Sequence, residues 1–164
     1  FEGEVVAGNF LVAAARALGS SAPRFNVAIL NPPYRKIGTD SVERQTLRKM
    51  GVEASNLYAG FLSAALLLLE EEDAELVAIT PRSFCNGPYF RHFRALLLQR
   101  SSLRRIHSFS RRDEAFRDEK VLQENIIVHA TRGAPPAERG RLTQHLRAEL
   151  GRAERAPGDP QGRR

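Results

Sequence analysis

Four consecutive residues, Asn31-Pro32-Pro33-Tyr34, have the types and order needed to act on an amino group. Neither proline can donate a main-chain hydrogen bond, and each restricts its own φ and the residue before it, so the segment is stiff. It offers two acceptors, the amide oxygen of Asn31 and the carbonyl of Pro32. Such acceptors suit a planar amino group on a heteroaromatic base. They would hold its two hydrogens out of the ring plane, which frees the nitrogen lone pair for attack.

The ring of Tyr34 adds a stacking surface to these acceptors. A base stacked on an aromatic side chain gains roughly 1–3 kcal/mol, and a base inside a duplex would first have to be flipped out. The same residues also suit an ordinary turn, since Asn-Pro and Pro-Pro are common turn formers. Their position favours the chemical interpretation, because they directly follow a strand-like apolar run.

The apolar run before the motif is the element that must position it. Residues 27–30, Val-Ala-Ile-Leu, are short, aliphatic and partly β-branched, which predicts a strand buried on both faces of a parallel sheet. In open α/β sheets, ligands bind at the carboxyl ends of the strands. The stiff loop therefore lies where a ligand is expected.

Apolar patterns elsewhere predict alternating strands and helices. Strands are expected within residues 1–8, around Val5-Val6-Ala7, and over residues 76–80, 103–109 and 125–130. Helices are expected over residues 10–18, 41–50, 56–72 and 89–99. The first strand, the first helix and the strand before the motif would form a βαβ unit with a right-handed crossover. The pattern indicates an α/β fold.

The composition of two helices predicts how they pack. Residues 10–18 are apolar all round, which predicts a mostly buried helix that ends at Gly19. Residues 56–72 carry too wide an apolar face for a surface helix, so this helix should pack against the sheet. Its Tyr58 and Phe61 either belong to the core or line a base or cofactor pocket.

Other residues mark helix ends and exposed faces. Asp40 or Ser41 is expected to cap the second helix, which Gly51 closes. On the last helix, Arg94 is expected to point outward and His92 to lie at the surface.

The motif resembles the catalytic motif of amino-group methyltransferases, and the segments after it resemble a narrower group. Residues 56–61 (Asn-Leu-Tyr-Ala-Gly-Phe) and 76–84 look like the next helix and strand of adenine-N6 DNA methyltransferases of restriction-modification systems, in which modification and often cleavage share one chain. Phe116, followed by Lys120-Val121 and residues 125–130, resembles their later hairpin. The resemblance runs from about Val5 to Thr131.

The resemblance implies an α/β, Rossmann-like, S-adenosylmethionine-dependent methyltransferase fold that is partial here. The family's first cofactor-binding strands and glycine-rich loop have no counterpart ahead of Asn31. Residues 1–132 would be a partial methyltransferase catalytic domain. Residues 133–164 read as a basic tail rich in Pro, Gly and Arg, largely disordered because it has no core to bury.

The family's site roles then fall on particular residues. Asn31 and Pro32, with Pro33 in the motif, would bind and activate adenine N6, and Tyr34 and Phe116 would sandwich the flipped base. S-adenosylmethionine would donate the methyl group. Phe116 could equally anchor its loop to the core. No metal is expected at the site.

Two flanking pairs complete the predicted site. Arg35 and Lys36 either contact DNA phosphates or form a solvated edge. Asn9 and Phe10 match the end of the family's third strand, where a usually acidic residue accepts from the cofactor's adenine amino group. Asn9 also suits the N-cap of the following helix.

The charge and the amino-acid composition of the chain indicate the kind of partner that it binds. The 164 residues carry a net charge of +6, with a pI near 10.2. Most of the cations are arginine, which suits bidentate contacts to phosphate, although coding-DNA composition also produces an arginine bias. DNA is the expected partner. Cys85 is the single cysteine, so no intrachain disulfide or cysteine metal cluster forms, and a reducing, cytoplasmic setting is the simplest interpretation. No apolar run reaches the roughly 18 residues of a membrane span.

Two other functions compete with adenine methylation. The first is methylation of a glutamine side-chain amide in a protein, since that family also uses Asn-Pro-Pro-Tyr; the basic charge and residues 76–84 argue against it. The second is a non-catalytic remnant that only binds nucleic acid, or a chain that needs a partner. Such a partner would be the missing N-terminal half or a target-recognition subunit.

Overall fold

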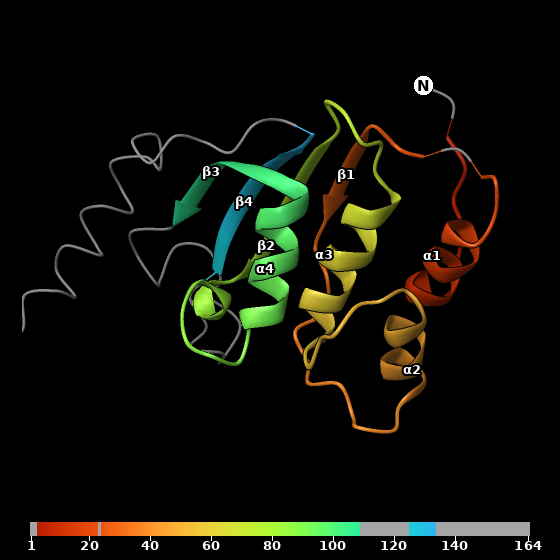
Figure 1. Cartoon of the computed structure of the whole chain (residues 1–164), viewed down its shortest axis with the longest axis horizontal. Helices are drawn as coiled ribbons and strands as arrows, with labels where there is room; N and C mark the ends of the chain where they lie inside the picture. The colour runs from red at the N-terminus through yellow and green to blue at the C-terminus, as the bar shows by residue number, and fades with distance from the viewer. Residues whose placement is uncertain (1–2, 23, 109–124, 134–164) are drawn as a thin grey trace, which may run out of the picture.

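In the part of the chain that the structure describes, a four-stranded mixed sheet has helices packed against one face (Figure 1). The computed structural model describes residues 3–22, 24–108 and 125–133. The strands are β1 (Val27–Leu30), β2 (Glu75–Pro81), β3 (Ser101–Ser108) and β4 (Asn125–Arg132), in the order β1-β2-β4-β3. β1 runs parallel to β2, and β4 is antiparallel to both of its neighbours. The carboxyl ends of β1 and β2 therefore lie at the same edge of the sheet.

Two helices cover the sheet, and two more pack beside them. The helices are α1 (Phe10–Leu18), α2 (Val42–Lys49), α3 (Leu57–Leu68) and α4 (Arg91–Arg100), with a 3₁₀ turn, η1 (Arg82–Cys85), after β2. α3 and α4 lie against the sheet, while α1 and α2 pack on α3 on the β1 side (Figure 1). All of α3 except Phe61 and Leu67 is buried, as its apolar composition predicted.

Polar residues and glycines set the ends of α1 and α2 close to the predicted residues. Ser41 Oγ accepts a hydrogen bond from Arg44 N at 3.2 Å and caps α2. Gly51 follows α2 with a φ of +72°, a conformation that favours glycine. Gly19 closes α1, also as expected. α1 is less buried than expected, because only Leu11 and Ala14 are fully covered by its neighbours.

The predictions for the first two strands need correction. Val5 and Val6 are 97% and 73% exposed and form no strand, so the described residues contain no βαβ unit ahead of the motif. β1 forms as predicted but is not buried on both faces, since Val27 and Ile29 are 49% and 81% exposed. Val27 and Ile29 pair with Glu75 and Val77, so they lie on the sheet face opposite to that of the buried Leu76. Among the described residues, β1 pairs only with β2 and is an edge strand.

α3 ends four residues before the predicted Glu72, because distant parts of the chain take up its last carbonyls. Phe25 N donates to Leu68 O at 3.1 Å, and Glu70 N donates to Phe25 O at 2.8 Å. Leu69 is already extended. The acidic residues that follow lie in a turn beyond the helix. The connection before β4, with Phe116, and the tail from residue 134 lie outside the described residues.

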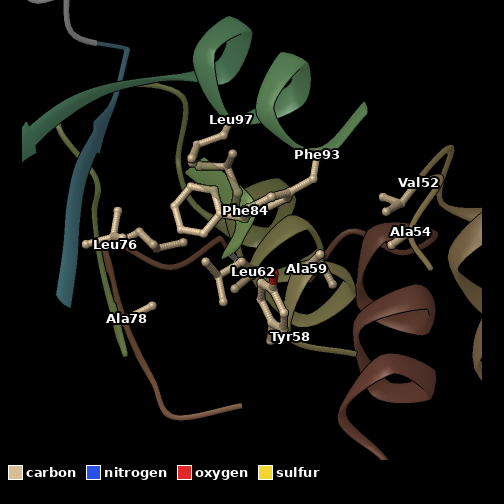
Figure 2. Close-up of a cluster of buried hydrophobic side chains, with 14 of the residues drawn as sticks. Val52, Ala54, Tyr58, Ala59, Leu62, Leu76, Ala78, Phe84, Phe93 and Leu97 are labelled. Carbon is tan, nitrogen blue, oxygen red and sulfur yellow. The ribbon is translucent and has the colours of Figure 1, made fainter. Parts of the chain in front are cut away.

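The core lies between the sheet and the α3/α4 layer. Figure 2 shows Tyr58 and Leu62 of α3 in one cluster with Leu76 of β2 and with Phe84 and Leu97 from η1 and α4. Each of these side chains is at most 3% exposed. Tyr58 therefore belongs to the core, one of the two alternatives for it.

Candidate active site

The Asn-Pro-Pro-Tyr motif forms the loop at the carboxyl end of β1. Asn31 and Pro33 are exposed, Pro32 is buried, and Tyr34 is half-buried. The buried ring of Pro32 anchors the segment between Asn31 and Pro33, which are exposed. The side-chain amide of Asn31 is therefore presented to solvent from a fixed backbone.

The residues after the motif are hydrogen-bonded to the start of α3. Leu57 N donates to Arg35 O at 2.8 Å, and Ile37 N donates to Ser55 O at 2.9 Å. Lys36 and Asn56 form the antiparallel bridge between these two bonds. The loop is thus held by β1 on one side and by the first turn of α3 on the other.

The ring of Tyr34 meets a buried ring of α3. Its centroid lies 6.1 Å from that of Tyr58, with the planes at 86°, an edge-to-face contact. Tyr58 also contacts Phe90, with centroids 5.4 Å apart. The sequence alone did not show this contact, because Tyr34 and Tyr58 share no motif or helix face.

The hydroxyl of Tyr58 reaches the second loop at this edge. It lies 3.3 Å from Ser83 Oγ in η1. Burial raises the pKa of Tyr58 to about 12, and the hydrogen bond with Ser83 lowers it by less. Tyr58 is therefore a neutral phenol near neutral pH. Its side chain connects the loop after β1 to the loop after β2.

Arg94 fixes the loop after β2 and does not point freely outward as predicted. Its guanidinium donates to the carbonyls of Phe84, Asn86 and Gly87, at 2.9, 3.0 and 2.6 Å. Three carbonyls in one turn suit the fan of donors on an arginine. His92 lies at the surface, as expected.

The predicted phosphate contacts lie beside the motif at the surface. The Arg35 side chain is 67% exposed, and its Nη2 lies 3.0 Å from Glu43 Oε1. The pKa of Glu43 is lowered, mainly by a hydrogen bond from its own backbone N–H, with smaller contributions from Ser41 and Arg35. Lys36 is exposed. The charge of Arg35 is thus shared with a carboxylate, while its side chain remains accessible.

Asn9 and Phe10 have structural roles at the start of α1. Asn9 Oδ1 accepts from Leu11 N at 3.0 Å and from Val12 N at 3.3 Å, which confirms the N-cap. Phe10 packs on Phe61, with centroids 5.1 Å apart. The acceptor expected to bind the cofactor is thus engaged with the helix. The cofactor role of Asn9 and Phe10 stays a prediction.

The described residues lack two further features, a metal-binding cluster and a membrane-spanning helix. Residues 3–22, 24–108 and 125–133 contain no group of three His, Cys, Asp or Glu side chains able to hold a metal ion. In the same ranges, none of the helices combines the length and the apolar character that crossing a membrane requires.

Sequence comparisons give the family of this chain. The model of the Eco57I restriction-modification methylase family matches residues 7–116. The type II methyltransferase M.PstI of Providencia stuartii is 55% identical over 112 residues, which are 68% of this chain and 22% of that protein. The type II methyltransferase M.BsuBI of Bacillus subtilis is 50% identical over 116 residues, 71% of this chain and 23% of that protein. The chain therefore spans less than a quarter of the length of these relatives.

Solved structures show the same fold at low identity. A modification subunit of a type I restriction enzyme from Vibrio vulnificus aligns with a TM-score of 0.61 and 14% identity, covering 92% of this chain and 35% of that one. A chain from another type I restriction-modification system aligns with a TM-score of 0.61 and 18% sequence identity. The alignment covers 92% of this chain and 32% of that one. A Listeria monocytogenes protein described as a class I S-adenosylmethionine-dependent methyltransferase aligns with a TM-score of 0.55 and 12% sequence identity. The alignment covers 73% of this chain and 36% of that one. The fold is thus part of a methyltransferase fold, and the chain belongs to the Eco57I restriction-modification methylase family.

Proposed function

We propose that this chain is the part of a DNA methyltransferase that binds and activates the N6 amino group of a flipped-out adenine. The observation that carries the proposal is the placement of Asn31-Pro32-Pro33-Tyr34 at the carboxyl end of β1. Ligands bind at this edge of an open α/β sheet. The family match and the two type II relatives support methyl transfer within restriction modification.

Each residue of the loop has a separate role in the proposed reaction. Asn31 Oδ1 and the Pro32 carbonyl accept the two N6 hydrogens and make the nitrogen lone pair available, and Tyr34 stacks on the base. S-adenosylmethionine, when bound, supplies the methyl group. Asn31 and Pro32 would hold N6 in place while it receives this methyl group. The nitrogen then loses a proton to water, so the chain needs no general base.

Arg35 and Lys36 complete the DNA-binding edge in this proposal. Both are exposed next to the motif, and Arg35 can exchange its contact with Glu43 for a phosphate. A DNA phosphate and Glu43 would compete for the same guanidinium. The remainder of the longer protein would supply the groups that hold S-adenosylmethionine and recognise the DNA sequence.

The test is transfer of tritium from labelled S-adenosylmethionine to duplex DNA, followed by digestion to nucleosides. This chain and a version extended upstream are each compared with their Asn31→Ala variant. We expect the extended protein to label adenine, and Asn31→Ala to lower the rate by about 100-fold or more, as for other groups that stabilise a developing charge. Asn86→Ala is the matched control, because Asn86 is an exposed asparagine in the neighbouring loop.

Two results would contradict the proposal. Label found on cytosine, or on protein glutamine, would assign the motif to another substrate. DNA binding without methyl transfer by either version would leave a nucleic-acid-binding remnant, with steep salt dependence of affinity as its signature.

A further inference from the structure

The ring of Tyr34 is half-buried and packs against the hydrophobic core. One of its contacts is the edge-to-face pair with Tyr58, at a centroid distance of 6.1 Å. A stacking residue is effective when its ring already has the orientation of the bound state, because no freedom is then lost on binding. The residue that sets the orientation of the Tyr34 ring therefore affects how well a base stacks on it.

Tyr58 is itself held from several sides. Its side chain is 1% exposed, lies beside Leu62 and Ala59 in the core (Figure 2), and contacts the ring of Phe90. Its hydroxyl lies 3.3 Å from Ser83 Oγ. A buried ring with a hydrogen bond at its far end has a single available orientation.

The helix that carries Tyr58 is fixed at both ends by the chain segment that contains the motif. At the start of α3, Leu57 N donates to Arg35 O at 2.8 Å. At its end, Phe25 N donates to Leu68 O at 3.1 Å. Residues 25 to 35 thus run along α3 with bonds at each end. The backbone that carries Tyr34 and the helix that carries Tyr58 therefore keep a constant relative position.

We propose that Tyr58 is a positioning residue for base stacking: its buried ring holds the Tyr34 ring in the orientation that receives the flipped base. This assignment rests on the proposed function for its consequence in catalysis. The geometric part, in which Tyr58 fixes Tyr34, stands on contacts of the free protein.

The first experiment tests the geometric part without DNA. The chain has three tyrosines and no tryptophan, so labelling with 3-fluorotyrosine gives three fluorine NMR signals that single Tyr→Phe variants assign. In Tyr58→Leu we expect the Tyr34 signal to narrow and to move toward that of an exposed fluorotyrosine. In Tyr58→Phe, which keeps the ring, we expect the Tyr34 signal to stay in place.

Leu66→Ala is the matched control, because Leu66 is a buried residue of the same helix, two turns away. It should lower stability as Tyr58→Leu does and leave the Tyr34 signal unchanged. A Tyr34 signal that is identical in the wild type and in Tyr58→Leu would overturn the proposal. So would an equal change in Leu66→Ala, which would indicate general loosening of the core.

The second experiment measures methyl transfer by the extended protein. We expect Tyr58→Leu to lower kcat by about 10- to 100-fold, as for a misplaced reacting group, with the KM for DNA changed by less than about twofold. Tyr58→Phe should restore kcat to within about threefold of the wild type, and Ser83→Ala should behave like Tyr58→Phe. A base analogue whose fluorescence is quenched by stacking, placed at the target position, should be less quenched in Tyr58→Leu alone.

The two experiments separate the two proposals. If the wild type transfers no methyl group to adenine, the proposed function fails, and the NMR result still decides whether Tyr58 fixes Tyr34. If the wild type is active and Tyr58→Leu keeps its kcat, the positioning role fails while the proposed function stands.

Discussion

At the scale of single residues, the backbone and the ring of the motif are held by different neighbours. Pro32 is buried and stiffens the loop, which presents Asn31 outward. The ring of Tyr34 is held by Tyr58, a residue of another element. The stiffness of the loop could be predicted from the two prolines, because it is a local property. The partner of the ring could not, because no local pattern relates Tyr34 to Tyr58.

The buried phenol of Tyr58 predicts a loss of stability in alkali. Burial raises its pKa to about 12 in the folded protein, against about 10 in an unfolded chain. The folded state therefore keeps its proton where the unfolded state loses it. This contribution is fully present below about pH 10 and is lost as pH rises toward about 12. We expect the wild type to lose about 1.4 kcal/mol of unfolding free energy between about pH 9 and pH 11 relative to Tyr58→Phe.

Urea unfolding of both proteins across this pH range measures the difference. The comparison with Tyr58→Phe removes the contribution of every other titrating group, because the two proteins differ in one hydroxyl. Parallel stability curves for the two proteins would show that the phenol has an ordinary pKa and that water reaches its hydroxyl.

At the scale of elements, α3 is the helix on which the site is built, and its end is set by residues far away in the sequence. The guanidinium of Arg132, at the end of β4, donates from Nη1 to Leu66 O at 2.8 Å and to Leu69 O at 2.6 Å. Its Nη2 lies 3.3 Å from Glu71 Oε1. The sequence predicted the existence of α3 from its apolar residues. It could not predict the end at Leu68, because the apolar pattern continues and the bonds that stop the helix come from β4 and Phe25.

Arg132 should therefore be important for stability although it lies far from the motif. Its side chain is 6% exposed, and burial lowers its pKa, with a smaller opposing effect of Glu71. A buried acceptor that loses its donor costs about 1–3 kcal/mol. We expect Arg132→Met to lower the free energy of unfolding by about 3 kcal/mol in urea denaturation.

Glu71→Gln is the control for this prediction. The Glu71 side chain is 84% exposed, and an exposed ion pair contributes at most about 1 kcal/mol. If Glu71→Gln destabilised the protein as much as Arg132→Met, the ion pair, and not the bonds to the carbonyls, would hold the end of α3.

Alanine substitutions at Gly133 and Gly51 provide a second test of the contact between the end of β4 and the turn after α3. Both have a positive φ, +74° and +72°. A Cβ on Gly133 would collide with the carbonyl of Glu71, whereas a Cβ on Gly51 would have nothing within 4 Å. Gly51→Ala should cost about 1–2 kcal/mol, the strain of a left-handed residue. Gly133→Ala should have the same strain cost and should lower the free energy of unfolding by about 1–3 kcal/mol more, because of the collision.

The difference between the two alanine variants, measured as free energies of unfolding, isolates the close approach of β4 to the turn after α3. Equal costs would mean that the turn moves away freely and that β4 does not determine its position. The glycine at residue 51 was predictable as a helix stop. The need for glycine at residue 133 was not, because the chain that it approaches is remote in sequence.

At the scale of the whole molecule, the described elements cover one face of the sheet and leave apolar side chains of the other face exposed. α3 and α4 lie over one face (Figure 1), and Leu76, Ala78 and Val128 belong to the core, each at most 1% exposed. On the opposite face, Val27 and Ile29 of β1 are largely exposed. The strand itself was predictable from its β-branched residues. Its place at an edge was not, because strand order depends on pairing between distant segments. An apolar run alone gives no information about which faces are covered.

An open apolar face beside an edge strand predicts self-association of the isolated chain. An exposed strand edge presents unpaired N–H and C=O groups, and apolar side chains next to it favour contact with a second molecule. Ile29→Lys places a charge in the middle of β1. We expect it to lower the weight-average mass measured by sedimentation at high protein concentration and to leave the free energy of unfolding within about 0.5 kcal/mol, since Ile29 is 81% exposed. Val42→Lys is the control, because Val42 is 63% exposed on α2, away from the sheet. Equal masses for the wild type and Ile29→Lys would mean that this face does not drive association; equal reduction by both variants would attribute the effect to net charge alone.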